Sequence, residues 1–381
     1  MNYLQYISSV YQSESIDTSK LRFLVSGKDF KIKQIVGRNI ISSCYSRGDI
    51  LFVLDNTRNK LDITSFCGYQ IMNILDGGVN LCIDLFNVKD LAGIARIRSL
   101  LADVGFDSIR SMKVINYLSF VQETEQCLGN TKPLTIDVLE EYSGTKLVEW
   151  KLNQLLEAGE INIDNYEYLL GKYSEISSAA TDFEQFLMLF APFIGGCSPS
   201  CKIAVYIPVG EFDIDKAMQQ MMCKLMLVNV QQNPEKSAVL IRDSGKGDRS
   251  FIVDIVTQLP TYTEVYMFSD DIFSLCDSDI GNLMNSFPVR IYTRHEDMVS
   301  CEKIEARCGQ IDVIQKSSTV TIDKRFRANS VWDILLGNNR TETEIKNVPT
   351  KEYRFRKEMV NSLRTGYGII DCAGEKVLFS F

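Results

Sequence analysis

Short, continuous apolar runs that alternate with helical segments constrain this chain more than any other feature. An apolar run without a polar face is typical of a strand in a parallel sheet that helices cover on both sides. The sequence therefore predicts an α/β fold with a mostly parallel sheet. The predicted strands are residues 21–27, 50–54, 79–86, 202–208, 238–241, 264–268 and 289–293.

The pattern changes in the middle of the chain. From Ile94 onward apolar residues recur every three to four positions, which indicates helices. We expect an all-helical insertion at 89–200, with helical runs at 109–126, 136–157 and 183–190. The two-part α/β core would then comprise residues 21–88 and 201–381, preceded by an extension at 1–20.

Further elements complete the predicted core. A hairpin is expected at the end of the chain, with strands at 366–372 and 376–381 around Ala373-Gly374. Helices are predicted up to residue 46 and at 66–75, 213–232, 251–259 and 279–285. The methionines between Met218 and Met226 stand at helical spacing, which favours a place in the core.

Composition excludes several kinds of protein. A net charge of −8 and a pI near 5.0 argue against a protein that coats nucleic acid non-specifically. No apolar run is long enough to span a membrane and no signal-peptide pattern is present, so we expect a cytoplasmic protein. The eleven cysteines are scattered through apolar runs, which favours reduced thiols. Cys197 and Cys201 share a loop without further ligands nearby, so no metal site is expected.

A degenerate phosphate loop follows the first predicted strand. A working loop has the pattern G-x-x-x-x-G-K-[ST], whose glycines let the backbone close on phosphate. Here Gly27 and Lys33 stand at the required spacing, but Ile32 replaces the second glycine and Gln34 replaces the hydroxyl residue. The segment predicts either a weakened phosphate site or an ordinary strand-to-helix turn with a solvated Lys33.

Two strands end in aspartate. Hydrolysis of ATP needs a strand that ends in Asp-Glu, with one carboxylate for Mg²⁺ and one to activate water. Asp243 follows the strand at 238–241, but Ser244 stands where the base belongs. Asp55 ends the strand at 50–54. Asp243 is therefore either a remnant of a catalytic site or simply the end of a strand.

The order of these elements resembles the TraG/TraD-type coupling proteins of conjugation and type IV secretion, in the FtsK/HerA group of P-loop motor ATPases. That family has a strand and P-loop first, an Asp-ended strand next, a helical insertion, and the Asp-Glu strand late. Segments 281–293, 300–309 and 355–370 are similar to its C-terminal part, whereas Ser269 and Asp270 stand where its glutamine sensor belongs. The resemblance implies a RecA-like fold, with ATP and Mg²⁺ as candidate ligands, Asp243 as catalytic residue, and Gly27, Lys33, Gln34 and Asp55 as nucleotide-binding residues.

Most hydrolytic positions depart from the family pattern. The leading hypothesis is a degenerate, non-catalytic subunit or adaptor in conjugative DNA or protein transfer machinery. It would assemble with a protein partner, such as an intact ATPase or a secretion subunit, as a homo- or hetero-oligomer. One alternative is an active ATP-driven motor that uses Lys33 and Asp243, and another is a DNA-binding module.

Three further features have two interpretations each. Arg325, Arg327, Arg354 and Arg356 alternate with aromatic residues, which is compatible with nucleic-acid binding or with ordinary edge strands. The turn from Gly245 to Arg249 is either a phosphate contact or a plain loop. His295, the single histidine, is followed by acidic residues and is expected in a solvated loop rather than a catalytic site.

Overall fold

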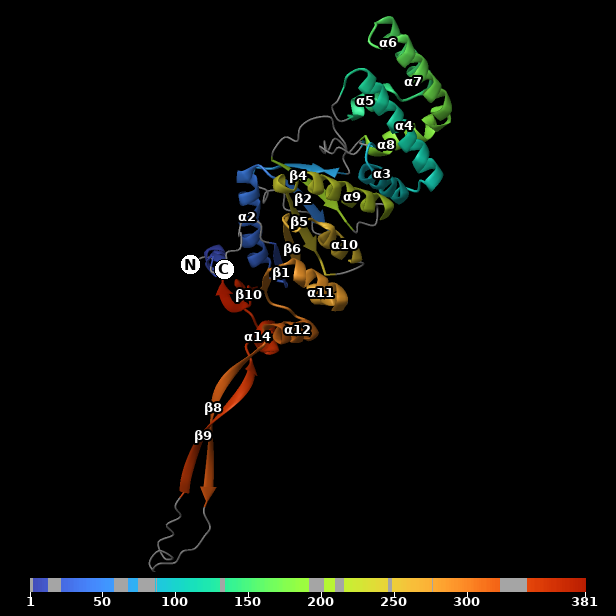
Figure 1. Cartoon of the computed structure of the whole chain (residues 1–381). Coiled ribbons are helices and arrows are strands. Elements are labelled where there is room, and N and C mark those ends of the chain that lie inside the picture. The colour runs from blue at the N-terminus through green and yellow to red at the C-terminus, as the bar shows by residue number, and fades with distance from the viewer. Residues whose placement is uncertain are drawn as a thin grey trace, which may run out of the picture. The chain divides into compact units, whose positions relative to one another are not determined.

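Figure 1 shows the chain as a computed structural model. Contacts divide it into two units, one formed by Met1–Thr293 with Thr365–Phe381 and the other by Arg294–Arg364. The residues that the structure describes are 3–12, 22–57, 68–74, 86, 88–130, 134–191, 202–209, 216–245, 249–275, 277–322 and 341–381.

A nine-stranded sheet forms the centre of the first unit, in the order β11-β10-β7-β1-β6-β5-β2-β4-β3. All neighbours from β3 to β7 are parallel, and β10 and β11 add an antiparallel hairpin at one edge. The predicted mostly parallel α/β fold is confirmed. The strands are β1 (Phe23–Ser26), β2 (Ile50–Asp55), β3 (Gln70–Asn73), β4 (Ile203–Pro208), β5 (Ser237–Asp243), β6 (Glu264–Ser269), β7 (Val289–Tyr292), β10 (Tyr367–Cys372) and β11 (Glu375–Ser380).

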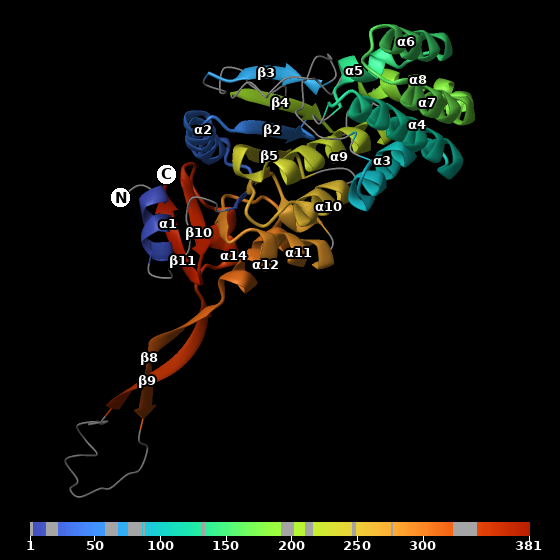
Figure 2. The same cartoon turned by 45° about the horizontal axis from the view of Figure 1, so that its top comes forward.

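Helices cover both faces of this sheet, which explains the continuous apolar strands. All six residues of β2 are buried. Leu51 and Val53 pack in a core cluster with α2 (Phe30–Arg47) and α1 (Tyr3–Gln12), so Phe52 between them faces the other side. Figure 2 shows α9, α10 and α11 on the side of the sheet away from α2. Their bounds are Lys216–Gln232, Ser250–Gln258 and Asp277–Ser286.

Two predicted core elements differ from the structure or lie outside it. The helix predicted at 66–75 is wrong, because Gln70–Asn73 forms β3 in parallel register with Ile203–Tyr206 of β4. Tyr69 and Ile71 fit a period of two as well as a helical one, and backbone pairing with β4 decides between them. The strand predicted at 79–86 falls almost entirely outside the described residues.

Every described element between residues 89 and 191 is helical. The core of these helices is aromatic, with Tyr117 stacked on Phe183 at 4.2 Å between ring centroids. The run predicted at 136–157 is two helices, because Gly144 interrupts it with a φ of +99°. The helices are α3 (Leu91–Asp103), α4 (Ser108–Cys127), α5 (Ile136–Glu141), α6 (Thr145–Glu157), α7 (Ile163–Ile176) and α8 (Ala180–Phe190).

The described residues of the second unit form two helices and a long hairpin. The helices are α12 (Met298–Cys308) and α14 (Lys357–Asn361). Strands β8 (Gln310–Ile322) and β9 (Thr341–Tyr353) form an antiparallel two-stranded sheet that the sequence analysis did not predict.

His295 also belongs to the second unit, and its predicted solvated position is wrong. The residue is 2 % exposed. Its carbonyl oxygen accepts hydrogen bonds from Asn361 Nδ2 at 3.0 Å and Cys301 Sγ at 3.6 Å, which holds the loop against both helices.

Three further expectations concern membrane helices, cysteines and methionines. In the part that the structure describes, no helix is both long enough and apolar enough to cross a membrane. Five of the six cysteines described as free thiols are buried, whereas Cys197 and Cys201 lie outside the described residues. Met221, Met222 and Met226 of α9 are buried in the core.

Candidate functional site at the carboxyl edge of the sheet

The carboxyl ends of four parallel strands gather the charged residues that the sequence singled out. Asp55 ends β2 and Asp243 ends β5, and Asp55 stands opposite Arg242 in the register of these two strands. Asp243 stands opposite Ser269 of β6. Lys33 reaches the same edge from α2, because its side chain pairs with Asp270, directly after β6. The structure therefore brings Lys33, Asp55 and Asp243 to one edge, where ligands of parallel α/β sheets usually bind.

The turn after β1 is much shorter than a phosphate loop. Gly27 has a φ of +122°, a conformation that glycine adopts without strain. Helix α2 already begins at Phe30, so only three residues separate strand and helix. Ile32 consequently lies in the first turn of a helix, whereas the P-loop pattern requires a glycine at this position.

Asp29 starts the helix early. Its side-chain Oδ1 accepts a hydrogen bond from the backbone N–H of Ile32 at 3.2 Å, which is a helix N-cap. Its Oδ2 accepts a second hydrogen bond from the backbone N–H of Gly366 at 2.6 Å. Asp29 is only 7 % exposed. A helix N-terminus attracts anions through its N–H groups and its dipole, and here a carboxylate of the chain itself occupies that position.

Ile32 and Gln34 stand at P-loop positions but do not have the residue types that the P-loop pattern requires. The Ile32 side chain is fully buried in the core between α2 and the sheet. A helix needs no glycine there, so the β-branched residue causes no backbone conflict. Gln34 is partly buried within the same helix.

Lys33 is paired rather than solvated. Its Nζ forms a short ion pair with Asp270 Oδ1, and the two side chains are 14 % and 48 % exposed. Burial lowers the pKa of Lys33, and the Asp270 carboxylate opposes that change by favouring the charged form. Asp270 thus holds the ammonium group that a nucleotide phosphate would require.

Asp243 is the most completely bonded group of the site. Its Oδ2 accepts hydrogen bonds from Arg249 Nη2 and Ser269 Oγ, both at 2.6 Å. Its Oδ1 accepts from Asn56 Nδ2 at 3.0 Å and from the N–H of Gly245 at 3.1 Å. Four donors use the acceptor capacity of a carboxylate. The Asp243 side chain is 0 % exposed and that of Arg249 only 3 %.

Asp55 is held in a similar way. Arg242 Nη1 donates to its Oδ2 at 2.6 Å, and the N–H and hydroxyl of Thr57 donate to its Oδ1 at 2.8 and 2.6 Å. Burial raises the pKa of Asp55, whereas Arg242 and Thr57 favour its charged form. The carboxylate thus has three donors, one of which is a cation.

ATP with Mg²⁺ does not fit the site in this arrangement. The phosphate position at the start of α2 holds the Asp29 carboxylate, which repels an anion. Both carboxylates that a metal ion would use are bonded to guanidinium groups. Lys33, Asp55 and Asp243 are thus each paired with a charged residue of the chain itself.

The predicted nucleic-acid residues belong to the second unit. Arg325 and Arg327 lie outside the described residues. Arg354 and Arg356 are exposed, and Arg356 Nη2 forms an ion pair with Glu352 Oε2 at 2.9 Å.

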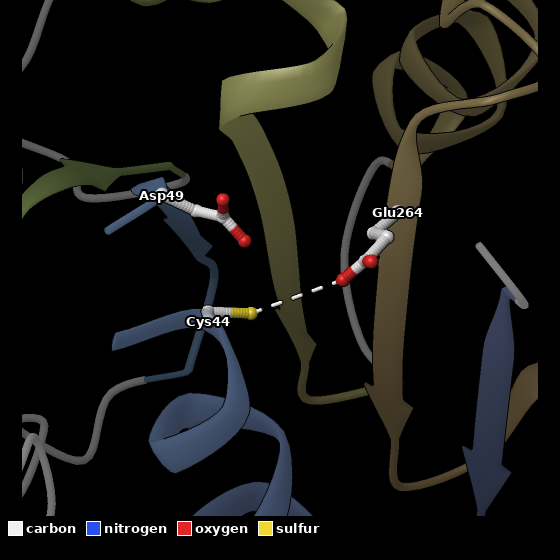
Figure 3. A group of neighbouring side chains, drawn as sticks. All are labelled: Cys44, Asp49 and Glu264. Carbon is white, nitrogen blue, oxygen red and sulfur yellow. Dashed lines mark hydrogen bonds between the residues drawn. The ribbon is translucent and has the colours of Figure 1, made fainter. Parts of the chain in front are cut away.

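The amino edge of the same sheet holds the one group of possible metal ligands found among the described residues. Figure 3 shows Cys44, Asp49 and Glu264, whose ligand atoms lie within 4.8 Å of one another. Arg47 Nη2 stands among them, 2.6 Å from Glu264 Oε2, 2.7 Å from Asp49 Oδ2 and 3.6 Å from Cys44 Sγ. Burial raises the pKa of Cys44 to about 12, with a further contribution from Glu264, so the thiol is protonated at neutral pH. A guanidinium nitrogen therefore takes the place that a metal ion would need.

The sequence predicts no role for Asp29 or Asp270, and for Arg249 only a place in a turn that contacts phosphate or forms a plain loop. An aspartate directly before a helical run is an N-cap signal, which could have identified Asp29. Arg249 was considered only as part of a basic turn that contacts phosphate, but it is turned inward to Asp243. No local pattern connects Asp270 to Lys33, since 237 positions separate them.

Comparisons with known proteins gave matches among solved structures alone. No protein-family model and no curated protein matches the chain. The chain is similar to the unbound bacterial conjugative coupling protein TrwB, with 12 % identity and a TM-score of 0.47, over 97 % of this chain and 89 % of that one. The match is distant. VirB4 of Thermoanaerobacter pseudethanolicus gives 11 % identity and a TM-score of 0.47, over 94 % and 89 % of the two chains. TrwB in complex with ADP and Mg²⁺ gives 13 % and 0.45, over 94 % and 83 %.

Proposed function

We propose that this chain is a pseudo-ATPase, a RecA-like subunit that assembles with a protein partner without hydrolysing ATP. One observation supports this function above all others. Each charged position that an ATPase keeps for its ligands is bonded to a residue of the chain itself. Arg249 binds Asp243, Arg242 binds Asp55, and Asp270 binds Lys33.

The Asp29 carboxylate completes this set of internal bonds. It supplies the negative charge at the start of α2, and the backbone of Gly366 fixes it from the C-terminal hairpin. Because these bonds lie between β1, α2 and β10, they connect the first and last parts of the unit. The former ligand positions therefore stabilise the fold.

The setting in conjugative DNA or protein transfer rests on the order of elements in the sequence, which resembles coupling proteins. In such machinery an inactive subunit can contribute its RecA-like fold to an assembly whose intact ATPase does the work. The partner we propose is that ATPase or another transfer subunit.

The experiment that tests this function is a phosphate-release assay on the full chain with MgATP. The native protein, Lys33→Ala and Asp243→Asn are compared after identical purification. We expect the native chain to release phosphate no faster than the two variants. Turnover that is present in the native chain and lost in Lys33→Ala would show an active motor and overturn the proposal.

A further inference from the structure

The β8–β9 hairpin of the second unit has two long strands. Each strand has 13 residues, and the register pairs Gln310 with Tyr353 at one end and Ile322 with Thr341 at the other. At about 3.3 Å per residue each strand spans about 43 Å. Among the described residues, these two strands pair only with each other. A two-stranded sheet is marginally stable in water, and a third strand or more is needed for independent stability.

The two outer edges of the hairpin differ in sequence. Strand β9 carries the features that protect an open edge from pairing, namely a proline that lacks an N–H and several charges. These residues are Glu342, Glu344, Lys346, Pro349 and Lys351. The second half of β8, Ser317–Ile322, has the sequence Ser-Ser-Thr-Val-Thr-Ile and contains no charge, proline or glycine. A long, uncharged edge rich in β-branched residues is a template for another strand.

We propose that β8 pairs with β8 of a second copy of this chain, in antiparallel orientation across a two-fold axis that passes between the two copies of Thr319. The pairing places Thr319 opposite itself, Ser318 opposite Val320, and Ser317 opposite Thr321, so that opposed residues lie on the same face of the sheet. A two-fold interface must be complementary to itself, and an uncharged stretch meets that condition because no like charges face each other.

Self-pairing also removes the instability of the isolated hairpin. It joins two two-stranded sheets into one four-stranded antiparallel sheet in the order β9-β8-β8-β9. The protected strand β9 then forms both outer edges, and the unprotected strand β8 lies inside. A register centred on Lys316 would place Lys316 opposite itself, and this repulsion disfavours it relative to a register centred in the uncharged stretch.

This inference concerns the second unit and does not depend on the state of the carboxyl edge. The test is the molar mass of the full chain by light scattering during size-exclusion chromatography. We expect a dimer, twice the 43.2 kDa of one chain. The double variant Ser318→Lys with Val320→Lys puts two pairs of lysines opposite each other, so the dimer dissociation constant should rise by at least about tenfold.

The control variant is Thr341→Lys with Thr343→Lys, which adds the same charge to β9 and should leave the dimer intact. A second readout is the variant Thr319→Cys. The proposed register puts this residue of one copy opposite the same residue of the other, within disulfide distance, so oxidation should give a covalent dimer that the native chain does not form. A monomeric native chain, a dimer that resists the β8 lysines, or an absent cross-link would each overturn the proposal.

Discussion

The ion pairs at the amino edge and at the carboxyl edge of the central sheet are buried to different degrees. At the amino edge one arginine, Arg47, serves both Asp49 and Glu264, and its side chain is 40 % exposed. At the carboxyl edge Arg249 and Asp243 form a pair that is 3 % and 0 % exposed. The Arg249–Asp243 pair, at the edge where parallel α/β sheets usually bind ligands, is thus the more deeply buried of the two. A group of charged residues at the usual ligand-binding edge of a sheet is therefore not necessarily accessible to a ligand.

The largest expected effect follows removal of the deepest pair. Arg249→Met leaves Asp243 buried without a cation, and breaking a buried pair on one side lowers the free energy of unfolding by about 3–5 kcal/mol. Urea unfolding of the native chain and the variant measures this loss. The double variant with Asp243→Asn, which removes the charge as well, should lose clearly less. A loss below about 1 kcal/mol in Arg249→Met would mean that the carboxyl edge is not closed by this pair.

The free energy of unfolding should fall less when the arginine at the amino edge is replaced. Arg47→Met removes charged hydrogen bonds to Asp49 and Glu264, but water reaches the guanidinium, so we expect a loss of about 1–3 kcal/mol. The same urea experiment compares it directly with Arg249→Met. An equal or larger loss for Arg47→Met would remove the difference between the two edges.

The Asp29 cap allows a matched comparison with a second aspartate. Asp107 caps α4 by accepting from the N–H of Arg110 at 2.8 Å, whereas Asp29 also accepts from Gly366. Replacing a capping aspartate by alanine costs about 0.5–2 kcal/mol. We expect Asp29→Ala to lie at the upper end and Asp107→Ala at the lower end in thermal unfolding. Equal losses would show that the bond to Gly366 contributes nothing.

The smallest effect concerns Cys44 at the amino edge. Its pKa is raised from 9.0 to about 12 by burial and by Glu264. Above pH 9.0 the unfolded thiol loses its proton while the folded one keeps it, so this group's stabilising contribution is lost as the pH rises from 9.0 to about 12. The expected loss is about 0.8 kcal/mol at half a pH unit above the ordinary pKa.

Cys44→Ala provides the control for this pH dependence. The variant lacks the thiol, so its free energy of unfolding should fall less steeply with pH than that of the native chain. The slopes are compared rather than the absolute values, because the variant also changes packing. Parallel slopes would place Cys44 in a more solvated environment than the structure shows.

The sequence predicts the strands of the sheet well and its charge pairs poorly. Burial on both faces leaves a direct trace in an apolar run such as Ile50–Asp55, and helical spacing likewise marks the insertion. A charge pair between distant residues produces no comparable pattern in the sequence. Arg249 follows a loop after Asp243, and only the folded chain shows that its side chain turns inward. For Lys33 the sequence predicts either a phosphate contact or solvation, because Asp270 belongs to a distant part of the chain.

The short element β3 and the hairpin strands show a second limit. Gln70–Asn73 is a strand because β4 lies beside it, and four residues carry too little pattern to indicate this. In β8 and β9 polar and apolar residues are mixed without a clear period of two. A buried face produces that period, and a strand that pairs mainly through its backbone does not need one.

The most direct test of the closed carboxyl edge is isothermal titration of the full native chain with MgATP, in parallel with Lys33→Ala. In the proposed account, Asp29 occupies the phosphate position at the start of α2. Asp270, Arg242 and Arg249 pair with Lys33, Asp55 and Asp243, so these side chains are not available to a nucleotide. We predict the same heats of dilution for both proteins up to millimolar nucleotide. Saturable binding by the native chain that disappears in Lys33→Ala would contradict the account, because it would show that Lys33 exchanges Asp270 for phosphate.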